Sequence, residues 1–97
     1  MGRVEDFLKL YRSGNTVRAY RWALTEFFKT VYGGDEGQLE EYADRYFSEK
    51  RDYEGDVKDF LAAVGDKPPK SVRLMLAAVR TFLLENGVEL PQRFWKT

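Results

Sequence analysis

Cationic side chains recur at helical spacing in the stretch "GNTVRAYRWALTEFFK", residues 14–29. Read at 3.6 residues per turn, its apolar residues fall on one side of a predicted helix. The neighbouring flank carries cations and an indole rather than a neutral polar mixture. Its members are Arg18, Trp22, Thr25 and Lys29, with Arg21 at the edge. Such a flank has the chemistry to bind an anion.

A second cationic row follows Pro68 and Pro69, which are tolerated only in the first positions of a helix. The apolar residues after them again share one face. The flank beside that face carries Lys70, Arg73, Ala77 and Arg80, with Lys67 and Ser71 near the start. The two predicted helices therefore have the same design, an apolar inner face and a cationic row that begins in the N-terminal turn.

This design suits a polyanion, because a helix N-terminus presents unpaired N–H groups and a partial positive charge. Asn15, Thr16 and Ser71 can add hydrogen bonds at the two N-termini. Lys and Arg in the following turns can reach adjacent phosphates, and Arg can pair with guanine in a major groove. The same residues also fit a simpler interpretation, in which the charged rows are solvated and the small polar residues cap helices. Periodicity alone leaves both interpretations open. Trp22 is interpreted as a packing residue at the edge of a neighbouring helix.

The composition restricts the function classes. The chain has 97 residues, which suffice for one modest core, and contains neither cysteine nor histidine. Disulfides, thiolate metal sites and histidine catalysis are therefore excluded, and we expect no metal and no cofactor. No signal peptide and no membrane span is predicted, so we expect a soluble, cytoplasmic protein without a membrane partner.

The formal net charge is zero, but the charge is unevenly distributed. Residues 1–34 contain six Lys or Arg against three Asp or Glu, and residues 67–97 contain six against two. Residues 35–66, which we call the acidic segment, contain four against eleven. A binding face responds to the local potential rather than to the total, so two basic regions flanking an acidic one remain compatible with a polyanionic partner.

Hydrophobic periodicity predicts five helices and no strand. The expected helices span about 4–12, from Ser13 or Asn15 to Gly33–Gly34, about 38–50, from Gly55 or Asp56 to Gly65, and from Pro68–Pro69 to Asn86–Gly87. The predicted fold is an all-α, compact orthogonal bundle of four to five helices. We assign residues 1–87 to this domain and residues 88–97 to a tail or the start of a linker. Two outcomes are open for Phe94 and Trp95: packing back on the helices, or leading into another domain.

Three segments in this order resemble the N-terminal core-binding domain of tyrosine recombinases, that is, phage-type integrases and Xer-like proteins. "NTVRAYRWALTEFF" has the spacing of the family's Thr, Tyr, Leu and Phe, and "GDVKDFLAAV" and "KPPKSVRLMLAAVRTFLLENGVELP" follow. The likeness covers nearly the whole chain. The helix within "QLEEYADRYF" is longer than the usual connection and resembles archaeal integrases, and its role in this chain is open.

The resemblance implies a SAM-like helical bundle that forms half of a clamp around double-stranded DNA. It implies DNA contact through Asn15, Thr16, Arg18, Arg21, Lys67, Lys70, Ser71 and Arg73, and Arg80 joins them as part of the same cationic flank. The family's catalytic Arg, Lys, His and nucleophilic Tyr belong to a C-terminal domain that this sequence lacks. We therefore expect DNA binding in site-specific recombination without cleavage by this chain, and no catalytic residue here.

The alternative function is a SAM-like protein interaction domain that acts in assembly. Recombinases assemble as tetramers partly through this domain, so other protomers are a second expected partner beside DNA.

Overall fold

The computed structural model describes residues 2–33 and 38–95. Within these ranges the chain is all-helical, with no strand, and the predicted fold class is confirmed. The elements are α1 (Arg3–Leu8), α2 (Gly14–Tyr32), α3 (Leu39–Ser48), α4 (Tyr53–Val64), α5 (Pro69–Glu85) and the single turn α6 (Gln92–Trp95).

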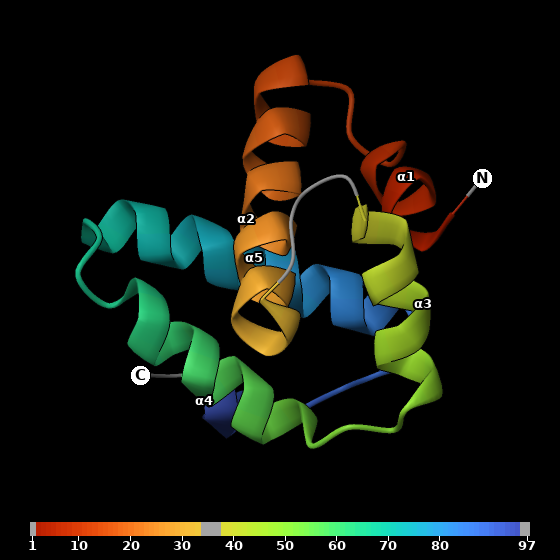
Figure 1. The fold of residues 1–97 in the computed structure, drawn as a ribbon. Coiled ribbons are helices and arrows are strands. Elements are labelled where there is room, and N and C mark those ends of the chain that lie inside the picture. The colour runs from red at the N-terminus through yellow and green to blue at the C-terminus, as the bar shows by residue number, and fades with distance from the viewer. Residues whose placement is uncertain (1, 34–37, 96–97) are drawn as a thin grey trace.

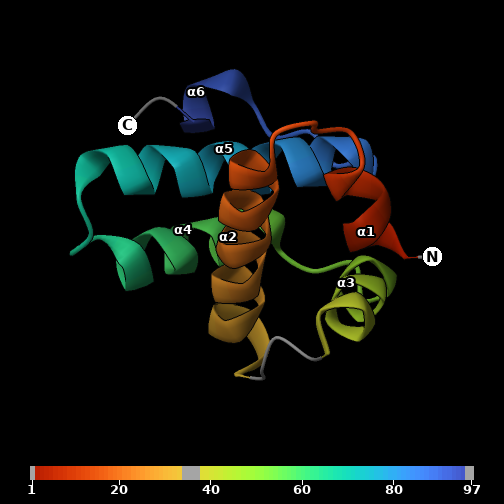
Figure 2. The ribbon, with the colours of Figure 1, turned by 90° about the horizontal axis from the view of Figure 1, so that it is seen from above.

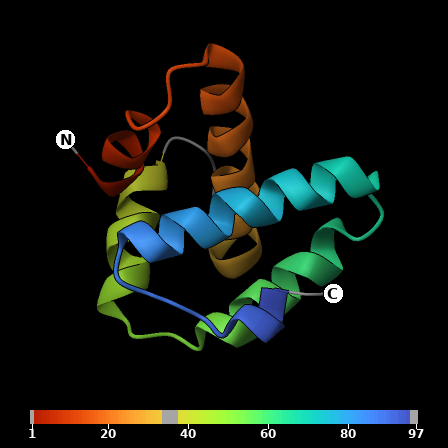
Figure 3. The same cartoon turned by 180° about the vertical axis from the view of Figure 1, so that it is seen from behind.

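The two long helices, α2 and α5, cross steeply and form the frame of the domain (Figure 1). Figure 3 shows the crossing from behind, with α5 in front. Helices α1 and α3 lie side by side near the C-terminal end of α5, and α4 packs against α2. Helix α6 lies on the side of α5 that faces away from α2 (Figure 2). The radius of gyration, 12.5 Å, is what a compact chain of this length has.

The ends of the two long helices follow local sequence signals. Of the two predicted caps for α2, Ser13 is the observed one, and its Oγ accepts the Thr16 amide at 3.4 Å. Pro69 is the first residue of α5. At its other end Gly87 has φ +84°, and the Val88 amide donates to the Leu83 carbonyl at 2.8 Å. This pairing is a Schellman motif, whose left-handed residue favours glycine, as the sequence predicted. Gly33 ends α2, whereas Gly34 lies outside the described residues.

Two predicted boundaries are wrong. Helix α4 starts at Tyr53 rather than at Gly55 or Asp56, because Asp52 caps it by accepting the Gly55 amide at 3.1 Å. Helix α1 ends at Leu8 rather than near residue 12. At the end of α1 the amides of Leu10 and Tyr11 donate to the carbonyls three residues earlier, and these i to i+3 hydrogen bonds tighten the last turn.

The core is built around aromatic rings, and Phe82 of α5 joins most of the helices. Its ring centroid lies 5.2 Å from that of Phe7, 6.2 Å from Phe28 and 5.7 Å from Phe47. These three rings come from α1, α2 and α3. Phe82 itself is fully buried. Phe82 therefore contributes to the packing of α5 against three other helices, together with the other buried residues of α5.

Several carboxylates of the acidic segment make hydrogen bonds and ion pairs within the fold. The Glu40 carboxylate of α3 accepts the backbone amides of Val4 and Glu5, each at 2.9 Å, and so caps α1 from another helix. Asp44 pairs with Arg3 at 3.2 Å. These contacts give α3 a structural role, which the sequence had left open.

A second acidic cluster ties α4 to the turn before it. Arg51 binds the Asp56 carboxylate through two nitrogens, at 2.9 and 3.4 Å, and Asp56 is buried. The buried Tyr46 hydroxyl has no hydrogen-bond partner of ordinary geometry among the described residues. Burial and the nearby Asp56 carboxylate raise the pKa of Tyr46.

Replacing Phe82 by Ala should destabilise the domain strongly. The change removes a ring that contacts three helices and leaves a cavity, so we expect the free energy of unfolding to fall by about 3–5 kcal/mol. Urea unfolding followed by circular dichroism measures this. The control, Leu84→Ala, removes an exposed side chain two residues away and should cost less than about 0.5 kcal/mol. Equal losses in the two variants would contradict the role assigned to Phe82.

Lowering the pH should weaken the contact between α2 and the end of α3, because protonation of Glu49 removes the charge that its hydrogen-bond donors bind. Its carboxylate accepts hydrogen bonds from Arg45 at 2.7 Å, Tyr32 at 2.8 Å and Arg51 at 3.2 Å. These hydrogen bonds lower the pKa of Glu49 from the ordinary 4.5 to about 2, and the bond from Arg45 is the largest cause. Because the folded pKa is the lower one, the stabilisation is present above pH 4.5 and is lost as the pH falls toward 2.

Glu49→Gln should therefore lose less stability than the unmodified protein between about pH 6 and about pH 3. Urea midpoints at the two pH values measure the difference. Glu89→Gln, which neutralises an exposed carboxylate elsewhere, serves as the control and should follow the unmodified protein. A Glu49→Gln variant with the same acid loss as the unmodified protein would show that this network does not stabilise the fold.

Candidate nucleic-acid interface

The cationic flank of α2 surrounds a shallow hollow of about 240 Å³, which we call the α2 hollow. Arg18, Arg21, Trp22 and Thr25 line it. The Arg18 guanidinium donates a hydrogen bond to the Asn15 side-chain carbonyl, one turn earlier. The structure thus brings together three of the residues predicted to bind DNA, and adds Trp22 and Thr25.

Arg21 is held by a carboxylate that the sequence interpretation did not consider. Its guanidinium binds both oxygens of Glu5 in α1, at 2.6 and 3.1 Å. The Arg21 hydrogen bond is the main cause that lowers the pKa of Glu5. Both side chains are partly exposed, so the pair is accessible to solvent. A phosphate that approached Arg21 would have to compete with Glu5.

Trp22 connects the α2 hollow with the loop before α5. The Lys67 ammonium lies 5.5 Å from the centre of the indole ring, at cation–π distance. Trp22 is 40% exposed and keeps much of its surface in solvent, so its packing at the edge of a neighbouring helix stays a prediction. Lys67, another predicted site residue, therefore lies beside the α2 hollow although it is far away in the sequence.

The N-termini of α2 and α5 differ in whether a side chain caps them. The Thr16 amide is already bonded to the Ser13 hydroxyl, so at α2 part of the N-terminal donor capacity is taken. Helix α5 has Pro68 as its N-cap, and no side chain among the described residues caps it. The first turn of α5, which holds Lys70 and Ser71, is thus the more available of the two N-termini.

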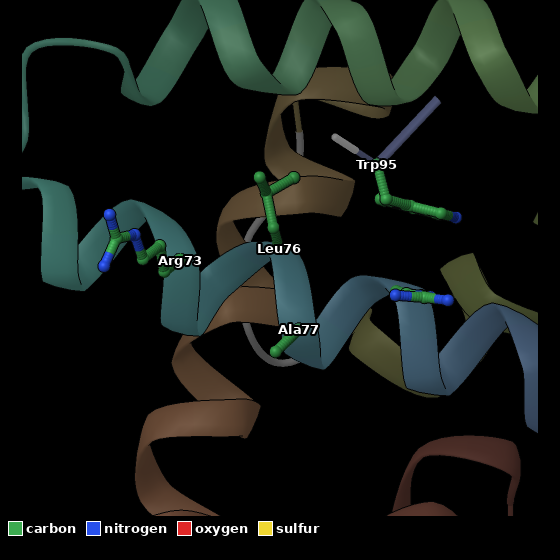
Figure 4. Close-up of a pocket in the computed structure, with 5 residues that line it drawn as sticks. Arg73, Leu76, Ala77 and Trp95 are labelled. Carbon is green, nitrogen blue, oxygen red and sulfur yellow. The ribbon is translucent and has the colours of Figure 1, made fainter. Parts of the chain in front are cut away.

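The outer face of α5 carries the remaining cations beside α6. A hollow of about 200 Å³, the α5–α6 hollow, is lined by Arg73, Leu76, Ala77, Arg80 and Trp95. Figure 4 shows Leu76 and Trp95 on one side of α5, with Arg73 at the end far from Trp95. The Arg80 guanidinium lies 5.6 Å from the centre of the Trp95 ring.

Trp95 therefore packs back on the helices, one of the two outcomes left open for the last residues, while the side chain of Phe94 lies outside the described part of the structure. The boundary assigned at residue 87 stays a prediction. The partner of Arg80 could not be identified from the sequence, because Trp95 lies in a segment without periodicity.

The candidate residues form two groups. The first group consists of Asn15, Thr16, Arg18 and Arg21 on α2, with Lys67 beside Trp22; the second consists of Lys70, Ser71, Arg73 and Arg80 on α5. The two hollows share no lining residue. Lys70 and Arg73 make no hydrogen bond or ion pair with described residues.

Several carboxylates of the acidic segment form ion pairs with arginines outside the candidate set. These arginines are Arg3, Arg45 and Arg51. The ion pair of Arg21 goes to Glu5, which belongs to the basic N-terminal region. Sequence reasoning missed two residues that contact a predicted cation: Glu5 binds Arg21, and the Trp95 ring lies near the Arg80 guanidinium.

None of the described helices has the length and apolarity that crossing a membrane requires. Within residues 2–33 and 38–95 no group of three or more Asp or Glu side chains is arranged to hold a metal ion.

Comparison with known proteins adds no relative: no protein-family model matches the chain, and neither the curated proteins nor the solved structures contain a match.

Proposed function

We propose that this domain binds double-stranded DNA as the core-binding module of a tyrosine recombinase or phage-type integrase and holds one face of the duplex during recombination. One observation carries the proposal. Arg18, Lys70 and Arg73 are exposed on the two long helices, while the ion pairs of the acidic segment are made with other arginines. The positive charge of these flanks remains available to an external polyanion.

The resemblance to core-binding domains supports the same conclusion. Its three segments fall on α2, α4 and α5, and the DNA contacts that it implies fall on α2, the loop before α5 and α5 itself. The resemblance is to a domain that binds DNA without the catalytic residues, so we propose binding without cleavage. Consistent with this, burial and the hydrogen bond to Glu49 raise the pKa of Tyr32 to about 12, and Tyr46 is buried, which makes both poor nucleophiles.

A protein interaction domain is the second candidate, because α5 also exposes apolar side chains. Leu74 is 37% exposed and Leu84 is 44% exposed. A protein partner, such as another recombinase protomer, would bury these leucines in a contact that depends little on salt. Binding to phosphates would weaken steeply as salt rises. Salt dependence therefore distinguishes the two candidates.

Titration of a fluorescently labelled duplex at several salt concentrations tests the DNA proposal. The double variant Arg18→Gln, Arg73→Gln takes one cation from each group and should bind more weakly at low salt. If both residues contact phosphates, the slope of log K against log salt should fall by about 0.9 for each, because fewer counterions are released.

A control variant that loses the same number of positive charges elsewhere distinguishes the effect of the site from the effect of the total charge. Lys50→Gln, Lys58→Gln removes two exposed positive charges within the acidic segment. We expect this variant to keep the salt slope of the unmodified protein. The proposal is wrong if the duplex does not bind at low salt, and the site assignment is wrong if the two double variants bind equally.

Neutralising Glu5 should strengthen DNA binding, because Glu5 competes with phosphate for Arg21. An exposed ion pair contributes about 0.2–1 kcal/mol, so Glu5→Gln should increase affinity by up to about fivefold at low salt. The same duplex titration measures it. Asp6→Asn, the adjacent exposed carboxylate of α1, removes the same charge without freeing Arg21. An equal gain in both variants would mean that only net charge matters.

A further inference from the structure

The α2 hollow combines an apolar wall with a cationic rim. Trp22 supplies an indole that is 40% exposed. The Thr25 hydroxyl donates to the Arg21 backbone carbonyl at 2.8 Å, so the remaining group of this side chain is its methyl. Arg18 and Arg21 complete the lining, and the Arg21 guanidinium also binds Glu5. Phosphate binding alone explains the cations and leaves the apolar wall unexplained.

The Lys67 ammonium acts on the indole itself. It lies 5.5 Å from the ring centre, where the attraction between cation and ring face restrains the side chain. The opening of the α2 hollow is thereby fixed in part before any ligand binds. Lys67 is a positioning residue for Trp22 in addition to its charge.

The major groove of DNA offers little apolar surface. The phosphates are charged, and the base edges present hydrogen-bond donors and acceptors. The exception is the C5 methyl group of thymine, which proteins contact with apolar atoms such as a threonine methyl or an aromatic ring. An apolar recess within a cationic surface matches that methyl group, with adjacent phosphates or a base edge in reach of the guanidiniums.

We propose that the α2 hollow receives the C5 methyl group of a thymine, held by Trp22 and Thr25 while Arg18 and Arg21 bind the flanking polar groups. This inference rests on the proposed DNA binding and adds a sequence preference to it. The domain prefers T·A base pairs at the position that meets α2. Phosphate contacts supply most of the affinity, and the hollow supplies discrimination.

A pair of duplexes that differ only in this methyl group tests the inference. One has an alternating A·T sequence, and the other carries deoxyuridine in place of every thymidine. Burying one methyl group is worth about fourfold in affinity, so the thymine duplex should bind about fourfold more tightly in competition titrations at low salt.

Two variants connect the preference to the hollow. Trp22→Ala removes the indole wall and should abolish the difference between the duplexes. Thr25→Ser removes one methyl group, keeps the hydroxyl that bonds the Arg21 carbonyl, and should reduce the difference. Both side chains are partly exposed, and circular dichroism with thermal unfolding verifies the fold of each variant.

The outcomes separate the two proposals. If neither duplex binds, the proposed function fails. If both duplexes bind the unmodified protein equally, or if the preference survives in folded Trp22→Ala, DNA binding stands and the thymine site is overturned. A preference that disappears in Trp22→Ala and is reduced in Thr25→Ser supports it.

Discussion

The packing of aromatic rings around Phe82 is the contact on which the rest of the domain depends. A ring from each of α1, α2 and α3 meets it, so the crossing of the two long helices is fixed by buried apolar surface. Because the inner faces of α2 and α5 turn toward this core, their polar flanks must turn outward. The exposure of the cations is thus a consequence of core packing, and no polar contact has to hold the flanks in place.

The ion pairs within the fold determine which cations remain available to an external anion. The acidic segment has a large negative charge, yet Asp44 and Glu49 pair with Arg3 and Arg45. The exception among the candidate residues is Arg21, which Glu5 holds through both oxygens. We propose that this pair moderates binding, since a phosphate can replace the carboxylate at small cost in an exposed pair.

The sequence predicted what depends on neighbours along the chain. Leu24, Phe27 and Phe28 are buried on α2 as their spacing indicated, and Pro69 and Gly87 mark the ends of α5. It did not predict where α4 begins, because several residues there can cap a helix and only the folded turn selects Asp52.

Long-range partners were beyond sequence reasoning. Glu40 caps a helix more than thirty residues earlier, and Glu5 reaches Arg21 across two helices. Trp95 meets Arg80 from a segment without periodicity. Each contact is set by how the helices cross, and periodicity within one helix carries no information on that crossing.

We propose that the cations of α2 and α5 bind one duplex together, which amide chemical shifts in a nitrogen-15 labelled protein can measure residue by residue. On titration with a short mixed-sequence duplex, we predict saturable shift changes concentrated in residues 14–25, in the loop at 65–68 and in the first half of α5. Changes confined to one of the two helices, or centred on α3, would contradict a shared DNA surface.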